Sequence, residues 1–238
     1  WLKSDDPRRL ATFDRCEKAS HKFLAQLTPK GEVVDIPYEE GKPLPAYFIR
    51  SPNGGSRQPV LISVGGLDSF KDEIWFMTGR GALQRGISVL LVDGPGQGGA
   101  LRRHGLVTRH DYEVPIGKCI DWLLQRSDVD PKRIAVCGSS MGGYYAARAA
   151  CYEPRLAAAI SHGAIWSLSD MWGNKTDEFG LAMHIRWVLG AKTMKEAHKI
   201  MVPFTLEGHL KNMKCPYLIL HGGHDVLTVS AAKKTYDS

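Results

Sequence analysis

Residues 138–142 read Gly-Ser-Ser-Met-Gly and match the pattern Gly-x-Ser-x-Gly, with Ser140 at its centre. Residues 133–137, before the pattern, are largely apolar, and residues 144–150, after it, are rich in helix-forming types. A strand, a tight glycine turn and a helix are the setting in which this pattern exposes a nucleophilic serine hydroxyl. Of the two serines, only Ser140 has glycine both two residues before it and two residues after it, so the pattern selects Ser140 and not Ser139. The alternative interpretation is a small residue in an ordinary strand-to-helix turn.

A serine nucleophile needs further groups around it. A histidine, oriented by a carboxylate, takes its proton, and two N–H donors stabilise the oxyanion that forms. The N–H of Met141 is one expected donor, and the other is expected from Leu67 or Gly66, in the loop after the third strand. Asp225 suits the orienting acid, because it follows a strand and lies 85 residues after Ser140. The chain order in such enzymes is serine, acid, histidine.

The histidine of that order is missing here. Thirteen residues follow Asp225, and none of them is histidine. Five histidines that precede or adjoin the acid are poor substitutes for the base, namely His162, His184, His209, His221 and His224. These last residues also indicate neither an eighth strand nor a closing helix. We therefore expect this sequence to be an incomplete copy of a longer protein.

The elements that must position these residues alternate between strands and helices. Apolar runs predict strands at residues 32–38, 45–50, 59–65, 86–93, 133–137, 156–162 and 215–221. Strands alternating with helices favour an α/β fold with a mostly parallel, doubly wound sheet and right-handed crossovers. Function in such sheets collects at the carboxyl ends of the strands. The residues expected at those ends are Leu67, Asp93, Ser140, His162 and Asp225.

The pattern divides the chain into four parts. Residues 1–28 form an amino-terminal helical segment, interpreted as part of a cap, and residues 29–164 form the first part of the core. Residues 165–212 hold three of six tryptophans and four of seven methionines and show no strand pattern. This composition fits a helical cap or lid insertion, although a plain packed helical layer is an equal alternative. Residues 213–238 form a truncated second part of the core.

The remaining glycine loop does not predict a nucleotide site. Residues 94–99 superficially resemble a phosphate cradle, but they lack the Gly-Lys-Ser/Thr ending of a P-loop and do not begin a clean helix. We therefore expect no nucleotide there, and no cofactor elsewhere.

Composition excludes several classes of protein. The 43% hydrophobic and 24% charged content is that of an ordinary globular domain. The net charge of +6 comes from scattered basic residues, which argues against nucleic acid as a partner. No apolar run reaches the ~18 residues that a membrane span needs. Five cysteines without a C-x-x-C pattern predict buried free thiols in a reducing compartment, the cytoplasm, and no metal site.

Several of these segments together resemble a known family. The sequence is similar to the α/β-hydrolase superfamily and, within it, to the FrsA-like esterases, a group that includes 2,6-dihydroxypseudooxynicotine hydrolase and fungal polyketide-shortening hydrolases of the yellowish-green type. The resemblance covers roughly residues 30–230 and rests on residues 65–69, 71–73, 93–98, 138–143, 204–208, 215–216 and 221–225. It implies a helical cap and, for the nearest members, hydrolysis of a carbon–carbon bond next to a carbonyl.

The expected function is a serine hydrolase that cleaves an ester or a carbon–carbon bond adjacent to a carbonyl. A non-catalytic ligand-binding protein of the same fold and an acyltransferase are the alternatives. The cap composition favours a bulky, partly apolar small-molecule substrate, with Trp166 and Trp172 as candidate contacts. The resemblance adds Asp170 near the cap entrance, although an ordinary solvated or helix-capping aspartate fits that position equally well. The sequence does not fix the oligomeric state, and a homodimer is one expectation.

Overall fold

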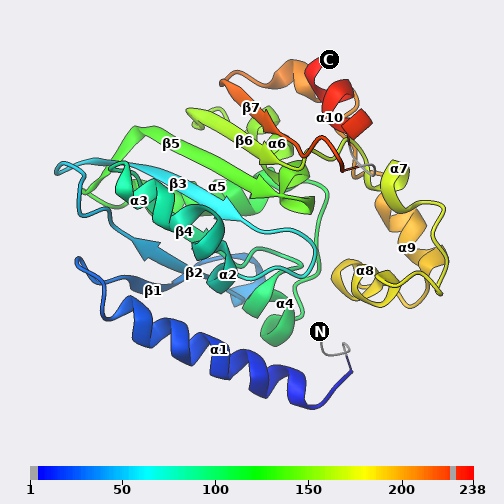
Figure 1. The fold of residues 1–238 in the computed structure, drawn as a ribbon, viewed down its shortest axis with the longest axis horizontal. Helices are drawn as coiled ribbons and strands as arrows, with labels where there is room; N and C mark the ends of the chain where they lie inside the picture. Colours follow the sequence, from blue (N-terminus) through cyan, green and yellow to red (C-terminus); the bar gives the residue numbers. More distant parts are fainter. Residues whose placement is uncertain (1–4, 226–228) are drawn as a thin grey trace.

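The computed structural model describes residues 5–225 and 229–238. Within them, seven strands form one sheet in the order β1-β2-β4-β3-β5-β6-β7 (Figure 1). The strands are β1 (Glu32–Ile36), β2 (Leu44–Ile49), β3 (Gln58–Val64), β4 (Ser88–Val92), β5 (Val129–Ser139), β6 (Ala158–His162) and β7 (Tyr217–Leu220). The pairs β1–β2 and β2–β4 are antiparallel, and every other neighbouring pair is parallel. The predicted α/β class and mostly parallel sheet are confirmed.

Helices cover both faces of this sheet (Figure 1). They are α1 (Arg8–Leu24), α2 (Lys71–Ile74), α3 (Arg80–Gln84), α4 (Gly98–His104), α5 (Glu113–Leu124), α6 (Met141–Tyr152), α7 (Leu168–Trp172), α8 (Ala182–Leu189), α9 (Met194–Met201) and α10 (Val229–Tyr236). A π-helical turn, Trp75–Gly79, joins α2 to α3. Helices α7, α8 and α9 gather at one end of the sheet, as Figure 1 shows, and their interpretation as a cap stays a prediction.

The central strands are buried on both faces. All residues of β2 and β4 are buried, which is why these stretches read as continuous apolar runs. Successive residues of a strand pack into different hydrophobic clusters, one on each face of the sheet. Phe48 and Leu90 belong to one cluster, whereas Tyr47 and Leu91 belong to the other. This alternation follows from the two-residue period of a strand. None of the helices in the described residues is both long and apolar enough to cross a membrane.

The loop at residues 94–99 corrects one prediction, because a helix does begin there. Helix α4 starts at Gly98. The side chain of Gln97, just before the helix, makes no capping bond. Instead, the carboxylate of Asp93 accepts a hydrogen bond from the N–H of Gly99 at 2.7 Å. An aspartate six residues before the capped N–H lies outside the usual capping pattern, which is why the start of this helix was not recognised from the sequence.

The end of the chain corrects a second prediction. Helix α10 follows β7, although no closing helix was expected in these residues. The stretch is short, but its alanines and lysines have high helix propensity. The cysteine prediction is correct in part: Cys119, Cys137 and Cys151 are buried, Cys215 is half-buried and Cys16 is exposed.

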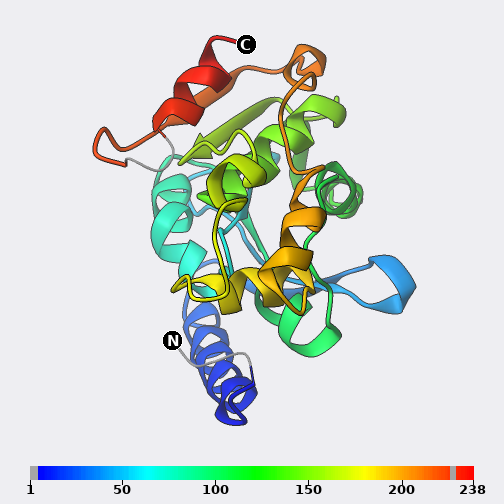
Figure 2. The same cartoon turned by 90° about the vertical axis from the view of Figure 1, so that its right-hand side faces the viewer.

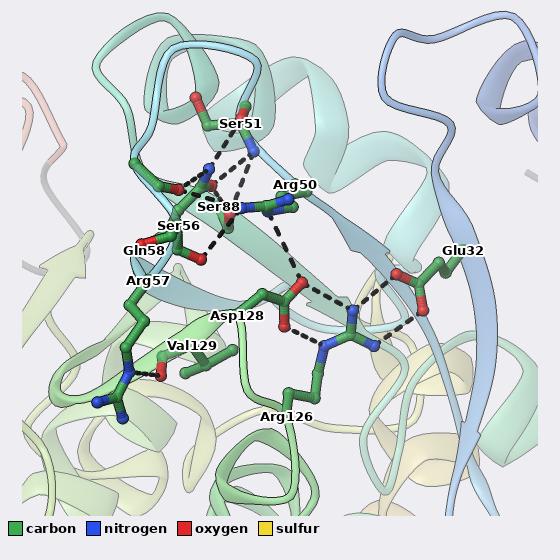
Figure 3. Close-up of polar contacts among 11 residues, drawn as sticks. Glu32, Arg50, Ser51, Ser56, Arg57, Gln58, Ser88, Arg126, Asp128 and Val129 are labelled. Carbon is green, nitrogen blue, oxygen red and sulfur yellow. Dashed lines mark hydrogen bonds and ion pairs between the residues drawn. The ribbon is translucent and has the colours of Figure 1, made fainter.

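Polar contacts fix the amino ends of the parallel strands (Figure 3). The buried side chain of Gln58, at the start of β3, accepts from Ser51 N–H at 3.1 Å and from the Ser88 hydroxyl. Arg126 binds Glu32 at 2.8 Å and Asp128 at 3.0 Å, which ties β1 to the loop before β5. The strand expected at residues 133–137 is longer in the structure, since β5 already begins at Val129. This cluster lies at the amino ends of the parallel strands, whereas Ser140 lies at the carboxyl end of β5. Its role is therefore structural.

Candidate active site

Ser140 occupies the sharp turn between β5 and α6. Its backbone has φ 56° and ψ −120°, a conformation that residues other than glycine rarely adopt. Two hydrogen bonds hold this strained turn: Ser140 N–H donates to the carbonyl of His162 at 2.7 Å, and the Ser140 carbonyl accepts from Gly143 N–H at 2.7 Å. The residue is solvent-exposed although its neighbours are buried. The fold therefore presents the Ser140 hydroxyl at the carboxyl end of β5.

The glycines around Ser140 are required by close backbone approach. A Cβ on Gly138 would lie 1.8 Å from the carbonyl oxygen of Gly142. A Cβ on Gly142 would lie 2.4 Å from the oxygen of Gly65, and one on Gly143 would lie 2.5 Å from the oxygen of Gly163. Helix α6 therefore begins against both the loop after β3 and the end of β6, and no larger residue fits.

The loop after β3 lies directly beside the candidate nucleophile. A Cβ on Gly66 would be 3.0 Å from the Cβ and 3.4 Å from the Oγ of Ser140. The buried amide of Gln97 donates to the carbonyls of Gly65 at 2.5 Å and Gly66 at 3.1 Å. On the other side, Met141 is the first residue of α6, and the first N–H groups of a helix have no acceptor within the helix. Gln97 was not predicted, since its partners are distant in sequence.

Replacing Gly66 with alanine is expected to lower kcat because the new Cβ pushes this loop away from Ser140. Its nearest neighbours, Ser140 Cβ at 3.0 Å and the Ser139 oxygen at 3.1 Å, belong to the packed turn and have little room to move. A displaced oxyanion donor typically costs roughly 100-fold in kcat. Gly55→Ala is the matched control, because a Cβ there meets nothing within 4 Å. Equal kcat values for both variants would contradict the expectation.

Asp225 lies at the carboxyl ends of the parallel strands, as Ser140 does. It follows β7, and β6 lies between β7 and β5. Its N–H donates to the carbonyl of Gly222 at 3.0 Å, and its side chain is 46% exposed. The imidazole of His221 lies 3.6 Å from its Oδ2. Solvent therefore reaches the Asp225 carboxylate directly.

A chain of hydrogen bonds links the acid-bearing strand to the serine turn. The hydroxyl of Tyr217, in β7, donates to Ser161 Oγ at 2.8 Å. Ser161, in β6, donates in turn to the carbonyl of Gly143 at 2.6 Å. Burial raises the pKa of Tyr217 to about 12, so its hydroxyl stays protonated and able to donate at neutral pH. These contacts fix the spacing between β7 and the start of α6, and the sequence did not reveal them.

Two of the three candidate substrate residues line the same cavity. Trp166 and Asp170 line a cavity of about 160 Å3 beside α10, where the Lys234 ammonium lies 4.4 Å from the Trp166 ring centre. Leu67 instead lines a cavity of about 400 Å3, whose walls are formed by α1, the loop after β3, α4 and α8. Asp170 is exposed, whereas Trp172 is 6% exposed and belongs to the core. The larger cavity adjoins the loop beside Ser140.

A buried charge network lies behind this loop. The Lys71 ammonium, with a side chain only 1% exposed, binds Asp93 Oδ2 at 3.0 Å and also Glu17 of α1. Asp93 further accepts from Lys71 N–H at 2.6 Å. Glu17 also pairs with Arg103 of α4. Asp93 was expected at the functional edge of the sheet, and it is fully buried there among structural contacts.

The sequence matches a known family over most of its length. Residues 70–236 fit the model of the prolyl oligopeptidase family. The chain belongs to this family. The matched region begins just after the loop beside Ser140 and contains both Ser140 and Asp225.

Several fungal hydrolases are similar in sequence to this chain. Hydrolase ffsE from Aspergillus flavipes is 37% identical over an alignment of 207 residues, which covers 79% of this chain and 45% of its own length. The 20-hydroxy-prefusarin hydrolase FUS2 from Gibberella moniliformis is 30% identical over 256 residues, covering 90% of this chain and 60% of its own length. The chain therefore spans about half the length of the curated relatives it matches.

A solved structure shows the same fold. The 2,6-dihydroxy-pseudo-oxynicotine hydrolase is 30% identical, with a TM-score of 0.88 over 100% of this chain and 65% of that protein. The α/β-hydrolase fold expected from the sequence is thus confirmed, as is the resemblance to this group. The dipeptidyl peptidase 4 of Porphyromonas gingivalis shares the fold at 18% identity and a TM-score of 0.65, covering 87% of this chain and 29% of its own.

Proposed function

We propose that this chain carries the nucleophile, the acid and the oxyanion donors of a serine hydrolase. The observation that carries the proposal is Ser140 itself, an exposed serine held at φ 56° in a strand-to-helix turn. Strain of this kind is kept at functional sites, because an ordinary turn would relax it. Asp225 is the proposed orienting acid, and the N–H groups of Met141 and Leu67 are the proposed donors. The names of the relatives, all hydrolases, support the same reaction class.

The proposed reaction cleaves an ester or a carbon–carbon bond next to a carbonyl. Ser140 Oγ adds to the carbonyl carbon while a histidine takes its proton, and the oxyanion is held by the two N–H groups. Collapse expels an alcohol, or a stabilised carbanion that takes the proton, and leaves an acyl-enzyme that water hydrolyses. The histidine of this proposal is not assigned to a residue, because none of the residues after Asp225 in this sequence is histidine.

The proposed substrate is a small, bulky and partly apolar molecule. The cavity beside the oxyanion loop supports this, since Phe13, Phe70 and Leu67 line it together with arginine and histidine side chains. All five cysteines are free, which supports a reducing compartment, and we propose the cytoplasm.

Fluorophosphonate labelling of the full-length protein tests the proposal. We expect one covalent adduct on the folded protein, located by peptide mass spectrometry at Ser140, and none after denaturation. A folded protein that takes no label would sink the serine-hydrolase proposal and favour a ligand-binding role. Parallel assays with aryl esters and with 1,3-diketones, which contain an activated carbon–carbon bond, then distinguish the two bond types. Product analysis with added alcohol separates hydrolysis from acyl transfer.

A further inference from the structure

Asp68 has an unusual backbone conformation directly after the proposed oxyanion donor Leu67. Its φ is 55°, in the left-handed region that favours glycine. The N–H of Ser69 donates to the carbonyl of Gly66 at 3.3 Å, which closes a four-residue turn with Asp68 at the third position. Turns with a left-handed third residue usually carry glycine or asparagine there. An aspartate at this position therefore calls for an explanation through its side chain.

That side chain is buried between two arginines from different helices. Arg9 Nη2, from α1, lies 2.7 Å from one carboxylate oxygen of Asp68, and Arg102 Nη2, from α4, lies 2.6 Å from the other. The three side chains are 7–10% exposed. Charge-assisted hydrogen bonds at these distances are short and directional. The turn beside Ser140 is thus clamped to two helices that lie far apart in sequence.

Helix α8 closes over the same cluster. His184 Nδ1 lies 3.4 Å from Asp68, and the Trp187 ring lies against the Arg9 guanidinium with 3.4 Å between Cζ and the ring centre. Helix α8 and the amino-terminal end of α1 lie on the same side of the molecule in Figure 1, the side that faces the viewer in Figure 2. Burial lowers the pKa of His184, so the ring is neutral at pH 7 and leaves Asp68 as the carboxylate shared by two arginines. Segments from α1, α4 and α8 therefore converge on one residue of the turn.

We propose that Asp68 is a positioning residue that sets the Leu67 N–H against the oxyanion and couples α1 and α8 to that geometry. The inference rests on the proposed function of Ser140. The Leu67 N–H belongs to the peptide between Gly66 and Leu67, inside the same closed turn as Asp68, so arginines that hold the Asp68 carboxylate also restrain that peptide. The cavity beside it, lined by Leu67, Arg9 and His184 among others, then assembles together with the oxyanion site. A change in the packing of α1 or α8 should consequently change kcat.

Asp68→Asn in the full-length protein tests this role, because asparagine keeps the shape and tolerates the left-handed backbone but removes the charge. We expect kcat for an aryl ester to fall roughly 10-fold to 100-fold, with KM changed by less than about threefold, since only the transition state needs the aligned donor. Affinity for a trifluoromethyl ketone, which forms a tetrahedral oxyanion with the serine, should fall by the same factor as kcat/KM. A purely structural residue would not link these two losses.

Two further variants keep the test decisive. Asp68→Gly relieves the backbone but deletes the carboxylate, so we expect the same loss of kcat, whereas a turn-forming role alone predicts an unchanged enzyme. Arg9→Lys, which keeps the charge but loses the arginine geometry, should lower kcat in the same direction even if the Asp68 variants fold poorly. Asp111→Asn is the matched control, since Asp111 pairs with Arg109 at 2.7 Å outside the Asp68 cluster.

The outcomes separate this inference from the proposed function. Wild-type protein that is neither labelled at Ser140 nor active means that the serine-hydrolase proposal fails. Active, labelled wild-type protein together with a fully active Asp68→Asn variant means that only the positioning role fails. A loss in Asp68→Asn confined to KM also overturns it.

Discussion

Replacing Ser140 with alanine is expected to lower kcat of the full-length protein by roughly 10⁴-fold to 10⁶-fold, the scale found when a serine nucleophile is deleted. In the proposed reaction Ser140 Oγ forms the acyl-enzyme, and alanine has no atom that could take its place. Alanine is smaller and the residue is exposed, so the fold should be retained. Initial rates on an aryl ester, measured beside circular dichroism of the same samples, check both statements.

Ser139→Ala is the matched control for this experiment. Ser139 is the adjacent serine and is 7% exposed, but it is the last residue of β5 and pairs with His162 in the sheet. Its substitution should leave kcat within about threefold of wild type. The change removes one small side-chain hydroxyl that has no part in the proposed reaction. A Ser139→Ala variant that is inactive beside an active Ser140→Ala variant would reverse the assignment of the nucleophile.

The serine turn could be predicted from the sequence because its determinants are local. Gly138 and Gly142 flank Ser140 within one short motif, and the strand and helix that it joins adjoin it in sequence. The sheet was predictable for a related reason, since the buried strands β3 and β4 read as unbroken apolar runs. Here each local preference agrees with the global fold.

The residues that hold the site were not predictable, because their partners are distant in the chain. Gln97 reaches Gly65 across 32 positions, and Arg9 reaches Asp68 across 59. In the sequence each of these is one polar residue among many in a loop or on a helix surface. Asp93 shows the same limit, since its place after a strand marked it as functional while its partners make it structural. Side-chain pairs this far apart in the sequence can be identified only in the folded structure.

Lys71→Met is expected to lower the free energy of unfolding by about 3–5 kcal/mol, the usual cost of leaving a buried charge without its partner. The Lys71 ammonium is almost fully buried between Asp93 and Glu17, so its loss leaves Asp93 buried without its cation. Glu17 retains Arg103, which limits the damage on the α1 side. Urea unfolding followed by circular dichroism measures the loss, and proteolysis within α1 should become faster.

The pKa of Lys71 determines how its contribution to the unfolding free energy changes with pH. Burial lowers the pKa of Lys71, but the carboxylates of Asp93, Asp72 and Glu17 outweigh burial and raise it to about 12. A raised pKa means that the folded state holds the proton more tightly, so the stabilisation is complete below the unfolded pKa of about 10.4 and is lost as pH rises toward 12. The difference in stability between wild type and Lys71→Met should therefore shrink over that interval and stay constant at lower pH.

Two controls decide whether the buried network is responsible. Lys233 forms a similar pair with Asp237 at 2.8 Å, but its side chain is 77% exposed, so Lys233→Met should leave the unfolding free energy unchanged within error. Adding Asp93→Asn to Lys71→Met removes the orphaned charge and should recover part of the loss, since a buried carboxylate without a cation is the costly species. If Lys71→Met is as stable as Lys233→Met, the network does not anchor α1. The position of the loop beside Ser140 must then be set by Gln97 and the Asp68 cluster alone.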